Sequence, residues 1–156
     1  MLEMDGGEVI PGRTATPLLK EALEVMDPDG LIERMDSSVR TYFRGVLLTL
    51  GTVGFGKCRV VSTRRTLEQQ QEIFGLGRTK AECRRFKVPQ KHAKPLAAQV
   101  TWIAPGLSRH LKGMAMDVSF RGYHDKTVDI IGHVARSFKC TWGGNWKVRD
   151  YGHFER

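Results

Sequence analysis

The stretch Ser108–Asp117, which reads SRHLKGMAMD, decides the fold, because it leads through a glycine into a strand that carries a carboxylate. From Met114 to Phe120 apolar and polar residues alternate, which predicts a strand with two different faces. Met116, Val118 and Phe120 share one face, and Ala115, Asp117 and Ser119 share the other. Aspartate is uncommon within strands. Asp117 therefore needs a cation or a metal ion as its partner.

Two histidines complete a candidate metal site around Asp117. His110 lies upstream, and Gly113 between the two residues lets the chain fold back towards the strand. His153 lies in the C-terminal stretch Asp150–Glu155. Two imidazoles and one carboxylate, with a fourth position open to water, are the ligands that a catalytic zinc ion requires. The remaining histidines are expected to be ordinary surface or hydrogen-bonded residues: His92, His124 and His133.

The rest of the chain predicts an α+β fold. Capping signals and apolar residues at three- and four-residue steps predict helices over residues 16–26, 32–50, 66–77 and 125–138. Apolar runs predict strands over residues 59–62, 100–104 and 114–120. Helices packed on one side of a small, mainly antiparallel sheet are the architecture that fits this order.

We interpret residues 1–156 as a single domain, because the chain is too short for two ordinary ones and contains no repeats. Residues 1–15 are expected to be a loose arm, 16–50 a helical scaffold, and 51–156 the catalytic body. Within that body, residues 78–99 form a predicted basic loop, with seven cations against the single acid Glu82. A loop of this length without regular structure is usually functional or mobile.

Composition and charge narrow the possible partners. Of the 156 residues, 40% are hydrophobic and 27% charged, which excludes a fibre, a disordered tail and an integral membrane protein. Residues 1–50 hold 5 basic and 9 acidic residues, whereas residues 51–156 hold 20 basic and 8 acidic ones. A basic body predicts a polyanionic partner, which could be nucleic acid, an anionic envelope surface or an anionic polymer. The three cysteines form no CxxC pair, so a disulfide framework or a zinc knuckle is not expected.

Three separated motifs resemble one group of enzymes. Ser108-x-His110-x-x-Gly113-x-Ala115-x-Asp117 resembles the SxHxxGxAxD motif of the zinc D-alanyl-D-alanine carboxypeptidases and dipeptidases. That group shares its metal-site fold with lysostaphin-type enzymes and hedgehog domains. The tail Trp142–Trp146, followed by Asp150–Glu155, is similar to the ending of the L-alanyl-D-glutamate peptidases among phage endolysins. Upstream, the segment 62–78 resembles that family's SGYRS…Q…GR pattern.

The resemblance implies a role for each residue of the metal site. His110, Asp117 and His153 correspond to the zinc ligands, so Zn2+ is the expected cofactor. Asp150 falls where the family carries its catalytic acid/base, and an aspartate there favours the endolysin branch over the dipeptidase branch. Glu155 has the same side-chain parity as His153 and remains an alternative as the base.

The substrate side is also implied by the resemblance. Arg65 aligns with the arginine that contacts substrate and stabilises developing negative charge, while Gln70 and Ser108 occupy positions that line the peptide site. Thr63 and Arg64 replace the usual Gly-Tyr pair, so Arg64 competes with Arg65 for the substrate role.

The sequence as a whole predicts a zinc-dependent hydrolase of peptidoglycan stem peptides. The L-alanyl–D-glutamate bond is the expected target, and a D-alanyl–D-alanine-type bond is the second candidate. A non-catalytic wall-binding module on the same fold would be expected to lose a metal ligand or the base, whereas this chain keeps all three ligands and the base. A nucleic-acid-binding protein would account for the basic body, but no recognition helix or finger motif is present.

The protein is predicted to act in phage lysis. Its expected partners are the stem peptide and an anionic envelope surface, and no dedicated wall-binding domain is expected. The longest apolar stretch, Gly45–Phe55, is shorter than the roughly 20 residues of a membrane span, and no secretory signal opens the chain. We therefore expect a monomer that is made in the host cytoplasm and reaches the wall after membrane release.

Overall fold

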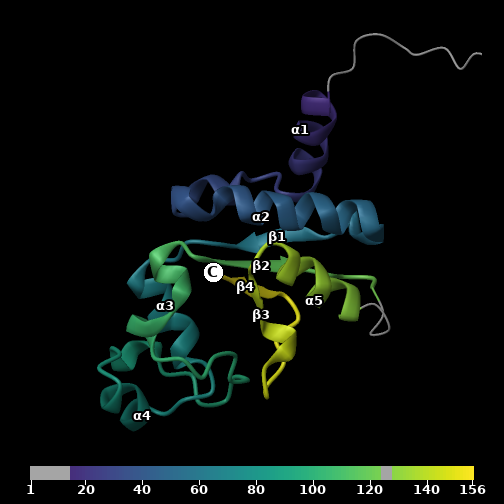
Figure 1. Ribbon diagram of the computed structural model, residues 1–156. Helices are drawn as coiled ribbons and strands as arrows, with labels where there is room; N and C mark the ends of the chain where they lie inside the picture. Colours follow the sequence, from purple (N-terminus) through teal and green to yellow (C-terminus); the bar gives the residue numbers. More distant parts are fainter. Residues whose placement is uncertain (1–14, 124–127) are drawn as a thin grey trace, which may run out of the picture.

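Four short strands form the centre of the protein (Figure 1). A computed structural model describes residues 15–123 and 128–156. The strands are β1 (Arg59–Ser62), β2 (Ala115–Ser119), β3 (Thr141–Trp142) and β4 (His153–Glu155), all paired antiparallel in the order β1-β2-β4-β3. The predicted small antiparallel sheet is confirmed. In the edge strand β1, Val60 faces the core, and Val61, which points to the opposite face, is exposed.

The register of the strands separates a core face from a site face. Met116 lies opposite Phe154 on the core face, and all of their side-chain surface is buried. One residue further along, Asp117 lies opposite His153 on the other face. Because side chains alternate along a strand, the same pairing that closes the core also places the carboxylate beside the imidazole.

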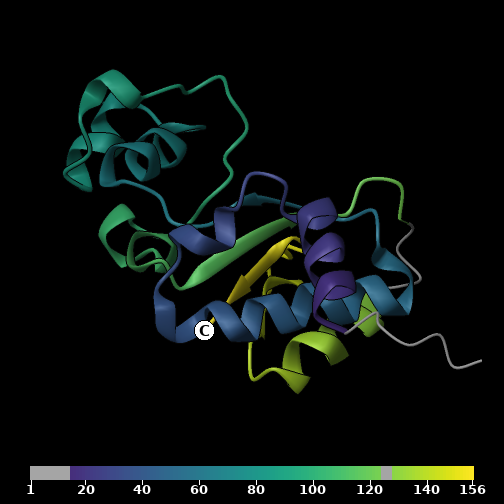
Figure 2. The ribbon, with the colours of Figure 1, turned by 90° about the horizontal axis from the view of Figure 1, so that it is seen from above.

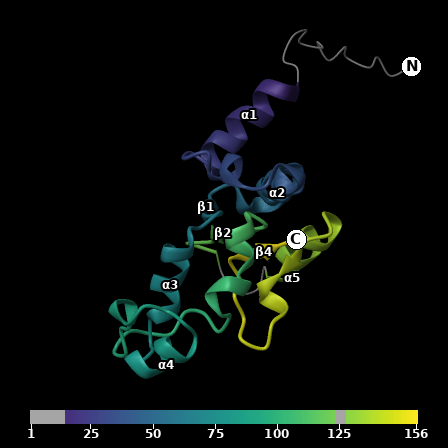
Figure 3. The same ribbon diagram turned by 90° about the vertical axis from the view of Figure 1, so that its left-hand side faces the viewer.

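Helices α2 (Ser37–Leu50) and α5 (Val128–Ser137) cover the core face of the sheet, and α1 (Ala15–Met26) packs on α2 and β1. Phe43 and Leu47 of α2 and Ile131 of α5 join the strand residues in one buried cluster. Figure 1 shows α2 lying along the sheet with α1 stacked beyond it, and Figure 3 shows α1 and α4 at opposite ends of the molecule. This arrangement confirms the α+β class.

The predicted helix over residues 32–50 is divided in two. A 3-10 helix, η1 (Leu31–Arg34), is followed by extended backbone at Met35, and α2 begins after Asp36, whose carboxylate accepts a hydrogen bond from Ser38 N–H. Asp36 N–H donates to the Gly113 carbonyl oxygen over 3.0 Å. The division arises because this backbone donor binds the loop before β2 instead of extending the helix.

Helices α3 (Leu67–Gly75) and α4 (Lys80–Arg85) form a lobe beside the sheet (Figure 2). The capping box of Thr66 and Gln69 that predicted α3 is present. The prediction of a structureless loop over residues 78–99 was wrong. A second capping box, Thr79 with Glu82, starts α4, and a 3-10 helix, η3 (Gln90–His92), follows. A small core of its own stabilises this lobe: Phe74, Cys83 and Val88.

Arg78 is a structural residue of the lobe, and not a solvated cation. Its side chain is buried and stacks on the Phe74 ring, with Cζ 3.7 Å from the ring centroid. The guanidinium donates hydrogen bonds to the carbonyl oxygens of Phe74 and Thr101. The strand predicted over residues 100–104 was wrong: the segment forms no strand, and the Thr101 carbonyl oxygen bonds Arg78 instead of a neighbouring strand. Val100, Trp102 and Ile103 are exposed, as expected for a run without a partner strand.

The remaining elements are connecting turns. After α2, the chain forms the irregular turn η2 (Gly51–Phe55), with Gly54 at φ 108°. Two 3-10 helices, η4 (Pro105–Leu107) and η5 (Arg109–Lys112), lead into β2, and η7 (Gly143–Asn145) follows β3. Helix α1 begins at Ala15, one residue before the predicted start. The predicted start of the last helix, at residue 125, lies outside the described residues, as do residues 1–14 of the predicted arm. Within 15–123 and 128–156, every helix is too short or too polar to cross a bilayer.

Candidate metal centre

The loop before β2 places His110 against the site face of the sheet. Ser108 caps η5 by accepting a hydrogen bond from His110 N–H over 3.3 Å. Gly113 ends η5 in the left-handed region, at φ 68°. A Cβ added there would lie 2.8 Å from Asp36 N, so the close approach of the two backbones also requires glycine. The turn predicted at Gly113 therefore brings His110 back over β2.

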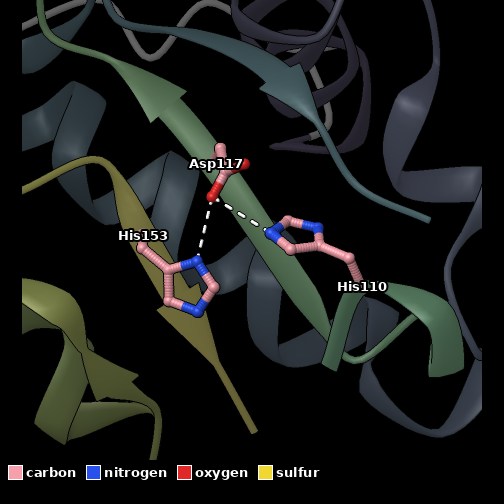
Figure 4. Close-up of side chains that lie close together, drawn as sticks. All are labelled: His110, Asp117 and His153. Atoms are coloured by element: carbon pink, nitrogen blue, oxygen red, sulfur yellow. Dashed lines mark hydrogen bonds and ion pairs between the residues drawn. The ribbon is translucent and has the colours of Figure 1, made fainter. Parts of the chain in front are cut away.

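His110, Asp117 and His153 converge on one point (Figure 4). Asp117 Oδ1 lies 3.2 Å from His110 Nε2 and 3.0 Å from His153 Nδ1. One ligand atom from each of the three residues lies within 4.8 Å of the others. Both histidines are buried. The sequence prediction that these three residues come together is confirmed.

The outer nitrogen of each imidazole has its own partner. His110 Nδ1 lies in hydrogen-bond contact with the Thr63 carbonyl oxygen. His153 Nε2 lies 3.1 Å from Glu155 Oε2. Metal-binding histidines generally bond a carboxylate or a carbonyl through the nitrogen that does not bind the metal. Two such histidines and one carboxylate fit the ligand set of a catalytic zinc ion.

Arg65 lies on the opposite side of Asp117. Its guanidinium forms an ion pair with Asp117 Oδ2, while Nε donates to Ser62 Oγ over 2.9 Å and Nη1 to Gln70 Oε1 over 3.3 Å. Arg64, its competitor in the sequence analysis, is exposed. The structure thus places Arg65, and not Arg64, beside the cluster.

The electrostatics of the cluster keep Asp117 charged and make His153 more basic. Burial would raise the pKa of the Asp117 carboxyl, but hydrogen bonds from His110 and His153 and the charge of Arg65 outweigh burial and hold that pKa well below its usual range. Burial would lower the pKa of His153, yet its contacts with Asp117 and Glu155 raise it instead. Asp117 is consequently an anion at neutral pH, as metal binding requires.

The other predicted site residues differ in their exposure to solvent. Gln70 and Ser108 are buried, the first bonded to Arg65 and the second capping His110, and their contact with substrate stays a prediction. Asp150 is exposed in the turn before β4, where its carbonyl oxygen accepts a hydrogen bond from His153 N–H over 3.2 Å. The hydrogen bonds of the described cluster do not include the Asp150 carboxylate, so its role as acid/base also stays a prediction.

Two contacts of the site were not anticipated. The Trp146 ring packs on His153 with the ring centroids 4.9 Å apart. Trp146 belongs to the aromatic tail already noted in the sequence, so the signal was present but carried no assigned role. The contact from Thr63 uses a backbone carbonyl, which no side-chain pattern could have indicated.

Comparison with known protein families concerns the same part of the chain. Residues 103–156 match the D-alanyl-D-alanine carboxypeptidase family model. The matched segment contains His110, Asp117 and His153, and the match confirms the resemblance of the Ser108–Asp117 motif to the D-alanyl-D-alanine carboxypeptidases. Together, the family match and the His-Asp-His cluster support a zinc metallopeptidase.

Two solved structures are similar to the chain. One is the Serratia marcescens L-Ala D-Glu endopeptidase ChiX, at 19% identity and a TM-score of 0.46, covering 85% of this chain and 91% of that one. The other is a variant of the vancomycin-resistance D,D-pentapeptidase VanY from a VanB-type cassette, in complex with Zn(II). It is 24% identical, with a TM-score of 0.51, and the match covers 78% of this chain and 71% of VanY. The likeness to VanY agrees with the α+β fold. A comparison with curated proteins gave no significant match.

Proposed function

We propose that the protein is a zinc-dependent peptidase that hydrolyses a bond of the peptidoglycan stem peptide. The observation that carries this proposal is the convergence of His110 Nε2, His153 Nδ1 and Asp117 on the site face, with Arg65 beside them. When bound, zinc would polarise a carbonyl and lower the pKa of water to near neutrality. The family description, a D-alanyl-D-alanine carboxypeptidase, supports a bacterial wall peptide as the substrate.

Arg65 is the proposed contact for developing negative charge. A guanidinium has five N–H donors. The described contacts of Arg65 with Ser62, Gln70 and Asp117 use one donor each, which leaves two for a substrate oxygen. The same contacts hold the group rigidly, so it needs little reorganisation when charge develops on the substrate.

Asp150 is the proposed general acid/base. The Glu155 carboxylate, its competitor, is engaged with His153 Nε2 at 3.1 Å. Asp150 is exposed and lies in the turn joined to His153 by a backbone hydrogen bond. In this proposal, its carboxylate takes a proton from the attacking water and delivers it to the leaving amine, so that it ends the cycle unchanged.

The proposed bond is L-alanyl–D-glutamate, because the ending Asp150–Glu155 resembles that of the endolysin branch. The family description favours a D-alanyl–D-alanine-type bond as the second candidate. We further propose a phage endolysin, made in the host cytoplasm and acting on the wall after membrane release. The cationic α3–α4 lobe supports attraction to an anionic envelope, since Arg84, Arg85 and Lys87 are exposed.

Digestion of purified peptidoglycan tests this function. Mass spectrometry of the products should show new D-glutamyl amino termini, whereas released D-alanine would support the second candidate. His110→Ala and His153→Ala should abolish both zinc retention and cleavage. His133→Ala is the matched control, because His133 is exposed on α5 and should change neither. A chain that cleaves neither bond when loaded with zinc would refute the proposal.

A further inference from the structure

Glu155 contacts the metal cluster through an imidazole. It lies two residues after His153 in β4, on the same face of the sheet, with Oε2 3.1 Å from His153 Nε2. The other ring nitrogen, Nδ1, lies 3.0 Å from Asp117 Oδ1. We propose that Glu155 is a positioning residue, which fixes the tautomer and orientation of His153 so that Nδ1 faces the metal. This inference rests on the zinc site of the proposed function.

The chemistry of imidazole explains how such a residue would act. A neutral imidazole carries its single N–H on one nitrogen and a lone pair on the other. A ligand nitrogen needs the lone pair, so the N–H of His153 must lie on Nε2 when Nδ1 binds zinc. A carboxylate at Nε2 accepts that N–H and disfavours the tautomer that would leave Nδ1 protonated.

The sheet fixes where the Glu155 carboxylate can reach. Glu155 lies in the central strand β4, opposite Ala115 of β2 and Thr141 of β3. The next residue, Arg156, donates its N–H to the Met114 carbonyl oxygen over 3.0 Å. The backbone under the carboxylate is therefore held on both sides. The contact with His153 then depends on side-chain length, and a carboxylate shorter by one methylene would stop short of Nε2.

His110 offers a comparison within the same site. Its outer nitrogen bonds the Thr63 carbonyl oxygen, which no side-chain substitution removes. The outer nitrogen of His153 depends instead on a side chain that can be changed. Trp146 packs against the His153 ring but contributes no acceptor to Nε2 among the described hydrogen bonds. Substitution of Glu155 should consequently affect one of the two histidine ligands and leave the other intact.

Zinc affinity of three variants, measured by competition with a chelator, tests the inference. Glu155→Gln keeps the reach and the acceptor oxygen but loses the charge, and it should bind zinc nearly as tightly as the unmodified chain. Glu155→Asp keeps the charge but loses the reach. Both Glu155→Asp and Glu155→Ala should bind zinc about 10- to 100-fold more weakly, the usual effect of losing an outer-shell partner. Glu68→Gln is the control, because Glu68 is an exposed acid paired with Lys91.

Spectroscopy adds a readout that a purely structural role would not change. In the zinc-loaded chain labelled with 15N-histidine, His153 Nε2 should appear protonated, and Glu155→Asp should broaden or shift that signal while the His110 signals stay in place. Melting temperatures of the metal-free variants separate misfolding from altered binding, and the Gln–Asp comparison remains valid if Glu155→Ala fails to fold.

The outcomes are distinct. Tighter zinc binding by Glu155→Asp than by Glu155→Gln would show that charge matters and not the hydrogen bond, which overturns the inference. Equal binding by all variants overturns it as well. If the unmodified chain itself binds no zinc, the proposed function fails instead, because the inference concerns only how tightly an existing site holds its metal.

Discussion

Replacing Gly113 by alanine should destabilise the protein and weaken its metal site together. An alanine in the left-handed region costs about 1–2 kcal/mol, partly offset by about 0.4–1 kcal/mol because alanine restricts the unfolded chain. The new Cβ would also lie 2.8 Å from Asp36 N, so the hydrogen bond from Asp36 N–H to the Gly113 carbonyl must lengthen or break. That bond contributes about 0.5–1.5 kcal/mol. The expected total loss is about 2 kcal/mol, within a range of roughly 0.5–3 kcal/mol.

Gly30 provides a matched control for this substitution. It has nearly the same conformation, φ 59° against 68°, but a Cβ there would meet no atom within 4 Å. Gly30→Ala should therefore cost only the backbone strain, roughly 1 kcal/mol. Urea unfolding of both metal-free variants gives the difference directly. At about 2–4 °C per kcal/mol, a loss of about 2 kcal/mol should lower the melting temperature of Gly113→Ala by roughly 4–8 °C.

Zinc affinity separates the two variants further. Gly113 sets the path between His110 and Asp117, so Gly113→Ala should bind zinc more weakly, whereas Gly30→Ala should bind it normally. Equal stability of the two alanine variants would refute the reasoning, because it would mean that the approach of Gly113 to Asp36 costs nothing.

Further predictions concern the acid/base, the thiols and the lobe. Asp150→Asn should keep zinc and melting temperature but lower the cleavage rate by about 10²- to 10⁴-fold, and a fully active variant would remove Asp150 from the mechanism. Burial raises the pKa of the Cys58 and Cys140 thiols to about 11, so at pH 8 iodoacetamide should label neither in the native protein and both in denaturant. Rapid native labelling would contradict their burial. Neutralising three exposed cations of the lobe, Arg84, Arg85 and Lys87, should weaken wall binding at low salt and change it little at high salt. A sedimentation assay with wall fragments measures this binding. Binding that is unchanged at every salt concentration would show that the lobe is an ordinary solvated surface.

The sequence predicted best what depends on local periodicity. The alternation around Asp117 and the left-handed turn at Gly113 are properties of a few neighbouring residues, so β2 and its preceding turn follow from them. The parity of residues in a strand also placed Glu155 on the face of His153, although not its partner atom. Asp150 could not be assigned in this way because it lies in a turn, where side chains have no regular alternation.

The missed features depend on distant partners. The apolar run at residues 100–104 has strand-like composition, but a strand needs a neighbour to pair with, and this run is held by Arg78 instead. The burial of Arg78 could not be predicted from the sequence, because its hydrogen-bond acceptors are backbone carbonyls, which every residue carries. Helix α4 is different, because its capping box, Thr79 with Glu82, is visible in the sequence. The helix was missed because the many cations of this segment favoured its interpretation as a loop.

The contacts that surround the metal cluster also determine when it can form during folding. Asp117 meets His153 across 36 residues, His110 meets Thr63 across 47, and Asp117 meets Arg65 across 52. Closing such large loops costs chain entropy, so we expect these contacts to form after the local ones. Thr63 and Arg65 also lie outside the matched segment 103–156. The three candidate ligands therefore lie in one segment of the sequence, whereas the carbonyl of Thr63 and the guanidinium of Arg65 that contact them lie in another. A site that binds metal consequently requires both segments to be folded against each other.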